Sequence, residues 1–155
     1  MELDSFDRHI LTILQGANTT PQRLIGEQVN LSAASVHRRI KKMEEQGVIQ
    51  ANIAVVDPAQ AGQRITVIVE VELASEQIDL IDEAKKSFYY APEVQQCYYV
   101  TGETDFILIV SVSSMEDYEL LTRRLFFGNT NVKRFRSFVT MDRVKVGLSV
   151  PLPSY

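Results

Sequence analysis

Apolar residues in the first fifty positions recur every three or four places, the period of helices that bury one face. A first helix is predicted between Asp4, a residue suited to the N-cap, and Gly16, where the helix would stop. Its inward stripe is Phe6, Ile10 and Ile13. The first predicted element is therefore an amphipathic helix.

Two shorter helices are predicted to follow. The second opens with Thr20 as N-cap and Pro21 as its first residue. The third opens at Ser32 and closes at Gly47. The inward apolar positions are Ile25 and Val29 in the second helix, and Val36, Ile40 and Met43 in the third.

Two residues indicate that the second and third helices form a helix-turn-helix. Helices that meet at a steep angle need a small residue where their backbones approach, and Gly26 stands at that point. The turn needs a residue that tolerates positive φ, and Asn30 is suited to it. Taken singly, Gly26 could be a chance glycine and Asn30 could be an ordinary C-cap. Together they favour the helix-turn-helix.

The pattern changes after residue 50. The run "VIQANIAVVDPAQAG" is apolar and then punctuated by Asp57, Pro58 and Gly62, which predicts a linker strand. From residue 64 apolar and polar positions alternate, as in a half-buried strand. We therefore expect a helix-turn-helix domain at 1–50, a linker strand at 51–63 and a second domain at 64–155.

The second domain is predicted to have the order βαββαβ, which is the ferredoxin-like fold in the α+β class. "VQQCYYVTG" and "DFILIVSV" form a hairpin around "ET", and Ser113 with Glu116 makes a capping box for the second helix. "VKRFRSFVTM" is the last strand. The first strand should place on one face Ile65, Val67, Val69, Val71 and Leu73. Helices on one side leave the other sheet face apolar and bare, so we expect a homodimer through this domain.

Positive charge is concentrated in one segment of the N-terminal domain. The chain has a formal charge of −4, yet residues 18–43 hold five Lys or Arg against one Glu. Turning Val36, Ile40 and Met43 inward puts Arg38 and Lys41 on the opposite face of the third helix. This pattern is typical of a helix that enters the major groove of double-stranded DNA. The predicted DNA-binding residues are Ser32, Ala34, Ser35, His37, Arg38, Arg39, Lys41 and Lys42.

We assign roles within this set. Arg38 is suited to a two-pronged contact with guanine, and Lys41 and Lys42 to phosphates. One helix alone would bind weakly, whereas a dimer would read two half-sites one turn apart on near-palindromic DNA. A charge such as Val69→Asp is expected to disrupt the dimer and abolish specific binding.

The sequence resembles the Lrp/AsnC family of transcription regulators over nearly its whole length. The similar stretches are "LDSFDRHILTIL", "LSAASVHRRIKKMEEQGVI", "DPAQAG", "PEV", "YYVTGETDFILIV" and "SFVTMDRVK". Gly26, Asn30 and Asn52 depart from the family's usual alanine, glycine and tyrosine.

The resemblance implies a small effector, an amino acid, held in clefts between dimers that assemble into tetramers, octamers or larger rings. The implied effector-binding residues are Gly102, Glu103, Thr104, Asp105, Met115, Ser137, Phe138, Val139 and Thr140. A tight turn with exposed N–H groups can hold a carboxylate, although Gly102 could equally serve only the hairpin. No cofactor or metal is implied.

Three other hypotheses about the function are considered. The first is an architectural DNA-binding protein that senses no effector. The second is an enzyme, but His9, His37 and Cys97 form no catalytic or metal motif, and we expect Cys97 to fill the core. The third is an RNA-binding protein, which is disfavoured because Tyr98 and Tyr99 point to opposite faces of a strand. The longest apolar run, "FILIV", is too short to span a membrane, so we expect a cytoplasmic protein associated with the nucleoid.

Overall fold

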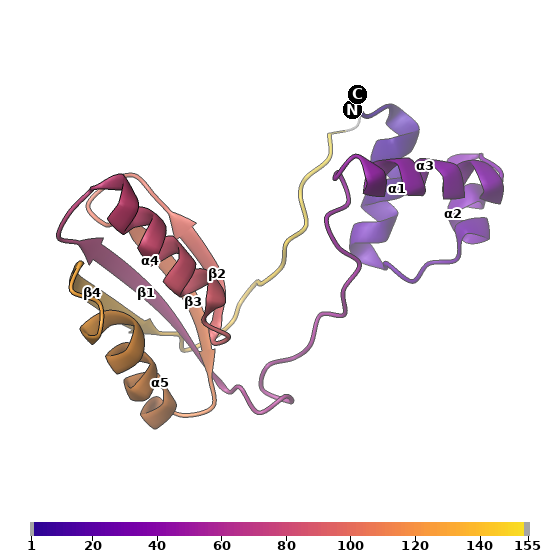
Figure 1. Ribbon diagram of the computed structural model, residues 1–155. Helices are drawn as coiled ribbons and strands as arrows, with labels where there is room; N and C mark the ends of the chain where they lie inside the picture. Colours follow the sequence, from indigo (N-terminus) through magenta and orange to yellow (C-terminus); the bar gives the residue numbers. More distant parts are fainter. Residues whose placement is uncertain (1, 154–155) are drawn as a thin grey trace. The chain divides into compact units, whose positions relative to one another are not determined.

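The structure is a computed structural model and describes residues 2–153 (Figure 1). The chain divides into two compact units. The first contains the described parts of residues 1–54 and 145–155, and the second is residues 55–144. The C-terminal segment is therefore grouped with the helical unit, whereas the predicted second domain of 64–155 included this segment.

The first unit contains three helices, α1 (Ser5–Gly16), α2 (Gln22–Val29) and α3 (Ala33–Glu45). Asp4 caps α1 as predicted, since its carboxylate accepts a hydrogen bond from the N–H of Asp7. The predicted cap of α2 was wrong by one position: Pro21 is the N-cap, and the Thr20 hydroxyl donates to Ala17. The side chains buried between the helices are Ile10, Leu11, Ile25, Val29, Val36 and Met43.

The turn between α2 and α3 follows the predicted chemistry. Asn30 lies in the left-handed region with φ 55° and ψ 44°. A methyl group added at Gly26 would collide with the main-chain carbonyl of Leu31. The close approach therefore needs glycine at one position and a tolerant residue at the other.

Residues 51–63 and the described residues of the C-terminal segment form neither helix nor strand. Residues 51–63 were predicted to be a strand, but the structure assigns no strand to them, and the backbone of residues 57–63 forms hydrogen-bonded turns instead. The C-terminal segment reaches α1, where the Gln15 side chain donates to the Val150 carbonyl and accepts from the Val150 N–H. Leu152 packs against the helical core.

The second unit is a four-stranded antiparallel sheet with two helices on one face (Figure 1). Its elements are β1 (Ile65–Leu73), α4 (Ile78–Tyr90), β2 (Val94–Tyr99), β3 (Phe106–Val112), α5 (Met115–Thr122), a π-helical turn η1 (Arg123–Phe127) and β4 (Val132–Val139). The strand order is β2-β3-β1-β4. The predicted ferredoxin-like βαββαβ fold is confirmed.

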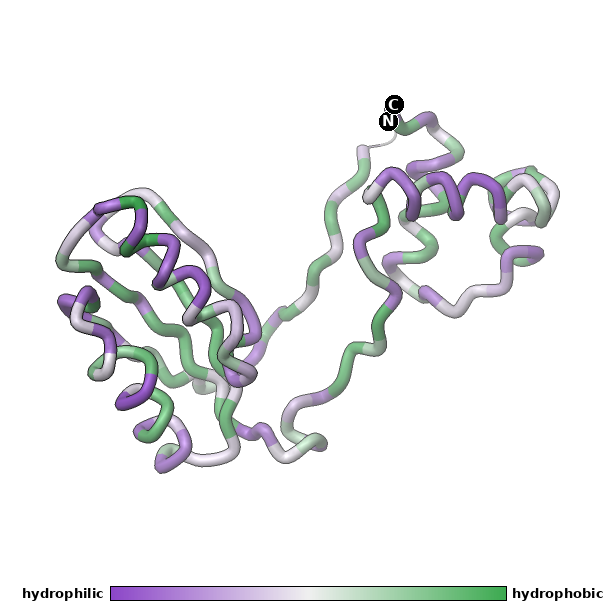
Figure 2. The backbone as a smooth tube through the Cα atoms, in the orientation of Figure 1, coloured by the Kyte–Doolittle hydropathy of each residue, from purple (hydrophilic) through white to green (hydrophobic). Residues whose placement is uncertain are grey.

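Alternation along β1 and β3 decides which side chains enter the core. Val67, Val69 and Val71 on β1 are fully buried beneath the helices, as are Phe106 and Leu108 on β3. Figure 2 shows both strands as largely hydrophobic. Val69 therefore belongs to the helix-covered core, and the proposal that Val69→Asp would act on a dimer interface was wrong.

The opposite, open face of the sheet carries the alternate residues. Ile68 pairs with Ile109 on β3 and with Phe138 on β4. Ile107 pairs with Tyr98 on β2. Phe138 and Tyr98 are each half exposed. These five residues form an apolar patch, called here the open-face patch, and the predicted bare apolar side of the sheet is present.

Two local predictions in this unit need correction. The N-cap of α5 is Ser114, which accepts from the N–H of Asp117, whereas Ser113 bonds the Asp117 carboxylate. The predicted capping box of Ser113 with Glu116 was therefore wrong. Cys97 is exposed on β2, because β2 is an edge strand with little cover, and so does not fill the core.

Candidate nucleic-acid interface and ligand site

The outer face of α3 is hydrophilic and exposed, and Figure 2 shows most of this helix as polar. Val36 and Met43 are fully buried on the inner side. The opposite side presents the exposed residues Ala34, His37, Arg38, Lys41 and Lys42. Small residues stand near the N-terminus of the helix and cations stand further along it. This order allows close approach of a grooved polyanion at one end and longer contacts at the other.

The first turn of α3 is held in place from within the unit. The Ser32 hydroxyl accepts from the N–H of Ser35 at 3.2 Å, so Ser32 is the cap that the sequence predicted. The ring Nδ1 of His37 lies 3.1 Å from the Gln22 amide nitrogen on α2. Both contacts connect the start of α3 to neighbouring backbone or side chains, and they leave Ala34 uncovered.

Arg38 and Lys42 take part in no ion pair with any residue between 2 and 153, so both charges are available to a partner. Lys41 lies 3.9 Å from Glu45, a loose contact between two exposed side chains. Exposed pairs of this kind contribute at most about 1 kcal/mol. Lys41 is therefore also available.

Arg39 is placed differently from the other predicted DNA-binding cations. Its Nη1 lies 2.7 Å from a carboxylate oxygen of Asp4 and 2.8 Å from one of Asp7. Helical spacing is a signal that could have found this, because Arg39 stands three residues after Val36 and four before Met43, on the buried edge of α3. The structure thus turns Arg39 toward α1.

The turn between β2 and β3 holds the first group of predicted effector residues. Gly102 has φ 122°, a conformation that side chains other than glycine rarely adopt. Within the described chain, none of the N–H groups of residues 101–104 donates a hydrogen bond. The side chain of Glu103 is exposed. A cluster of N–H groups that have no acceptor within the described chain is suited to binding a carboxylate.

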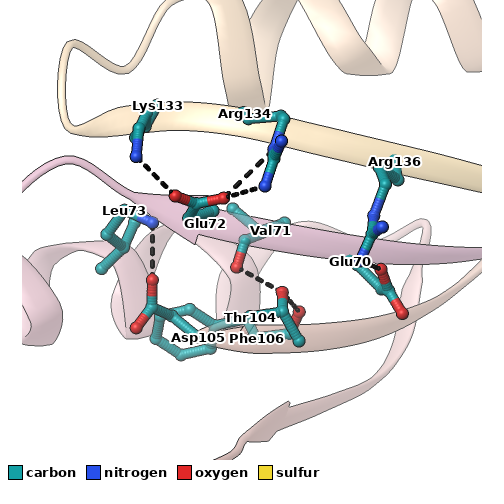
Figure 3. A network of polar contacts seen from close by, with 10 residues as sticks. All are labelled: Glu70, Val71, Glu72, Leu73, Thr104, Asp105, Phe106, Lys133, Arg134 and Arg136. Atoms are coloured by element: carbon teal, nitrogen blue, oxygen red, sulfur yellow. Dashed lines mark hydrogen bonds and ion pairs between the residues drawn. The ribbon is translucent and has the colours of Figure 1, made fainter. Parts of the chain in front are cut away.

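Thr104 and Asp105 are engaged with β1 rather than presented outward (Figure 3). The Thr104 hydroxyl donates to the Val71 carbonyl at 2.9 Å. The Asp105 carboxylate accepts from the N–H of Leu73 at 2.6 Å, and the Asp105 N–H donates to Val71. These contacts hold the end of β1, so Gly102 and Glu103 are the members of the turn left for a ligand.

A ladder of ion pairs lies beside this turn on the open face of the sheet (Figure 3). Arg136 on β4 lies 2.5 Å from Glu70 on β1. Glu72 is bonded by Lys133 and Arg134, at 2.7 and 2.6 Å, and these two cations hold the pKa of Glu72 below its ordinary value. These residues were not predicted from the sequence to form a site. The signal was present as acids at alternate positions of "VEVE" and bases in "KRFR".

The second group of predicted effector residues lies at the other end of β1. Thr140 donates to the Thr66 carbonyl through both its N–H and its hydroxyl, whereas the 101–105 turn contacts Val71 and Leu73. Val71 is five steps along the strand from Thr66, roughly 17 Å at about 3.3 Å per residue. A single chain therefore does not bring the two groups around one small ligand.

The other members of this second group share that end of the sheet. The Ser137 hydroxyl is bonded to the Tyr118 hydroxyl at 2.5 Å on the helix side, and burial raises the pKa of Tyr118. Phe138 and Val139 are each half exposed, and Met115 is exposed at the start of α5. Surfaces of this kind are available to a neighbouring molecule.

A hollow lies elsewhere in the second unit. It has a volume of about 260 Å³ and lies beside α5. An ion pair of 2.7 Å between Arg124 and Glu93 borders it. None of the predicted effector residues lines it.

Neither a metal centre nor a membrane span is indicated in residues 2–153. No three His, Cys, Asp or Glu side chains there are grouped closely enough to hold a metal ion. No helix there has the length and apolar content needed to cross a bilayer.

Comparison with known proteins gives matches to both units. Residues 3–50 match the family model for a winged helix-turn-helix DNA-binding domain, and residues 66–150 match that for the Lrp/AsnC ligand binding domain. An uncharacterized HTH-type transcriptional regulator from Sinorhizobium fredii is 41% identical over 152 residues, covering 98% of this chain and 90% of that protein.

Solved structures of similar fold cover nearly the whole chain. The crystal structure of an AsnC family transcriptional regulator from Agrobacterium tumefaciens has a TM-score of 0.90 at 31% identity and covers 97% of both chains. A transcriptional regulator from Neisseria meningitidis, solved as a complex with L-methionine, has a TM-score of 0.90 at 25% identity, again with 97% of both chains covered.

Proposed function

Since the chain belongs to the Lrp/AsnC family and is a transcriptional regulator with a DNA-binding helix-turn-helix, we propose that it reads specific double-stranded DNA as a homodimer under the control of an amino acid. The family consists of transcriptional regulators and not of enzymes. The observation that carries the proposal is the outer face of α3, where Arg38 and Lys42 are exposed without intramolecular partners in the described chain.

In the proposed complex α3 lies in the major groove. Ala34 and Ser35 approach base edges, and Arg38 donates two hydrogen bonds to one guanine. Lys41 and Lys42 contact phosphates, and such contacts make the affinity fall with salt. His37 stands beside this row, fixed through its ring to Gln22. One helix with three cations binds only at the non-specific level, about 10⁻⁴ to 10⁻⁶ M, so specific binding requires a second copy.

The open-face patch is the surface that we propose for the homodimer. Burying Ile68, Ile109 and Phe138 against the same residues of a second copy removes apolar surface from water. The ion-pair ladder of Glu70 with Arg136 borders the patch and provides a charged rim. A dimer of this kind holds two α3 helices in a fixed relation, which suits near-palindromic DNA.

We further propose that the effector binds between subunits of a larger assembly, a tetramer, octamer or larger ring. The turn that contains Gly102 and Glu103 has free N–H groups for a carboxylate and an exposed acid for an ammonium group. Within one chain, the residues near Val139 and Thr140 lie too far from this turn to contact the same small ligand. They can contact a ligand bound at the turn only if they come from another subunit. The L-methionine complex of the Neisseria meningitidis regulator supports an amino acid as the chemical class.

Effector control follows if the ligand binds one assembly more tightly than another, because the difference in affinity shifts the balance between them. Isothermal titration calorimetry with each of the twenty amino acids, paired with sedimentation velocity of the liganded protein, tests this. A ligand that binds and changes both the sedimentation coefficient and the DNA affinity is the expected result. The rival reading, an effector-independent architectural protein, has no support among the comparisons. This rival hypothesis predicts that no amino acid binds and that the DNA affinity of the protein is the same in the presence of each amino acid.

A further inference from the structure

We infer that Arg39 is a positioning residue for DNA recognition: it fixes α3 to the capped N-terminus of α1 and does not itself contact DNA. The inference rests on the contacts of one guanidinium group with two carboxylates and a ring. It extends the assigned DNA-binding function by separating one cation of α3 from the others.

The two carboxylates form a closed network with Arg39. One oxygen of Asp4 accepts from the N–H of Asp7 at 2.8 Å, and one oxygen of Asp7 accepts from the N–H of Asp4 at 3.2 Å. The remaining oxygen of each acid accepts from Nη1 of Arg39. The same two carboxylates therefore cap the N-terminus of α1 and form the ion pairs to α3.

A third contact fixes the side chain from another direction. The guanidinium carbon of Arg39 lies 5.3 Å from the centre of the Phe6 ring, a cation–π geometry. The N–H of Asp7 holds the pKa of Asp4 below its ordinary value, and Arg39 adds to this effect. The hydrogen bonds that Arg39 donates to Asp7 and Asp4 raise the pKa of Arg39. Both shifts favour the charged forms of Asp4 and Arg39.

Burial of Asp7 makes the network hard to open. Asp7 is 3% exposed, while Arg39 and Asp4 reach the surface. If Arg39 swung out to a phosphate, a buried carboxylate would lose its cation, and leaving such a charge unpaired is strongly unfavourable. The phosphate would also bring a negative charge toward Asp4. Arg39 therefore stays on α1 when DNA binds.

The consequence for recognition is geometric. Arg38 is the neighbour of Arg39 on the same helix, so the anchor at Arg39 sets the rotation of α3 about its axis. Two-pronged contact with a base edge needs such a fixed orientation. Without the anchor, α3 still has Arg38, Lys41 and Lys42 for phosphates, but the base contacts are misplaced.

Salt dependence distinguishes positioning from direct contact. A removed phosphate contact lowers the slope of log affinity against log salt by about 0.9, and a removed positioning residue leaves the slope unchanged. The full-length chain would first be used to select its preferred duplex from a random DNA library. Affinity for that duplex and for a scrambled duplex of equal composition is then measured by fluorescence anisotropy at several salt concentrations.

The informative variants are Asp7→Asn, Arg39→Gln and the double variant that combines them. The double variant removes both charges and leaves two amides that can bond to each other, so it remains folded even if a single variant does not. Asp4→Asn, at an exposed position, is the milder single change. Lys42→Ala is the reference for a lost phosphate contact, and Arg123→Ala, on the other unit, controls for loss of one surface cation.

We expect Asp7→Asn, or Asp4→Asn if the former is unfolded, to lower the ratio of specific to scrambled affinity by about tenfold, the effect of misplacing one base contact. We expect the double variant to keep the wild-type salt slope and to recover part of the ratio. A slope reduced in the double variant as much as in Lys42→Ala would overturn the inference. An unchanged ratio of specific to scrambled affinity in a folded Asp7→Asn protein would also overturn the inference, because loss of a positioning contact must lower that ratio.

Discussion

The side-chain amide of Gln15 and the main chain of Val150 form two hydrogen bonds, of 3.0 and 2.6 Å, across 135 residues of sequence. They attach the C-terminal segment to α1, and Leu152 packs on the helical core beyond them. The DNA-binding unit therefore includes residues from both ends of the described chain. A helix-turn-helix defined from residues 1–50 alone would lack this segment.

Replacing Gln15 tests this attachment. Gln15→Ala removes both hydrogen bonds at an exposed site, so we expect the free energy of unfolding of the helical unit to fall by about 1 kcal/mol. The matched control is Gln28→Ala, which removes an exposed glutamine from α2. Urea denaturation followed by circular dichroism gives both values. Equal effects of the two changes would show that the Val150 contact contributes nothing.

The depressed pKa of Asp4 predicts how stability depends on pH. Because the folded pKa lies below the unfolded value, the stabilisation is present above about pH 4 and is lost as the pH falls through the folded pKa. Asp4→Asn keeps a capping side chain but removes the charge. We expect it to be less stable than wild type at pH 7 and equally stable near pH 2. Denaturant midpoints measured from pH 2 to pH 7 give the difference, and a difference that is constant with pH would contradict the assignment.

Neighbouring acids in the 101–105 turn are expected to behave in opposite ways. Asp105→Ala leaves the N–H of Leu73 without its acceptor and should lower the free energy of unfolding by about 1–3 kcal/mol. Glu103→Ala alters an exposed side chain and should change stability by less than about 0.5 kcal/mol while weakening amino-acid binding. Chemical denaturation and calorimetry on the same samples separate the two effects. Normal ligand binding by Glu103→Ala would remove that acid from the proposed site.

Ile68 and Val69 are adjacent in β1 and face opposite sides of the sheet, so they form a matched pair. Val69→Asp places a carboxylate in the helix-covered core, where it should cost more than about 4 kcal/mol and unfold the second unit. Ile68→Asp places the same charge in the open-face patch, where it should leave the fold intact and yield monomers. Circular dichroism and light scattering after gel filtration distinguish these outcomes. A folded Ile68→Asp protein that remains dimeric would contradict the proposed interface.

Much of this architecture could be predicted because burial repeats with a period along the chain. The apolar stripe of Val36, Ile40 and Met43 fixed the inner side of α3, and the alternation in β1 fixed its helix-covered face. Asn30 could be assigned because few residues tolerate a positive φ. In each of these cases the physical requirement lies within one element.

The errors arose where the deciding partner is distant in sequence or competes locally. The ion pairs of Arg39 were not predicted, because the acids that bind it stand more than thirty residues earlier in the sequence. Residues 51–63 were expected to form a strand, but an apolar run forms a strand only beside a partner. Ser113 and Ser114 are both able to cap α5, and the sequence does not distinguish them.

The central claim is that two α3 helices, held by one dimer, read DNA through Arg38. It is tested most directly by the affinity of wild type, Arg38→Ala and Ile68→Asp for the selected duplex and for the same duplex with one half-site scrambled. We predict that wild type discriminates between the two, and that Arg38→Ala loses about 1–3 kcal/mol of that discrimination. Ile68→Asp should bind both duplexes equally and weakly. Undiminished discrimination by both variants would contradict the account.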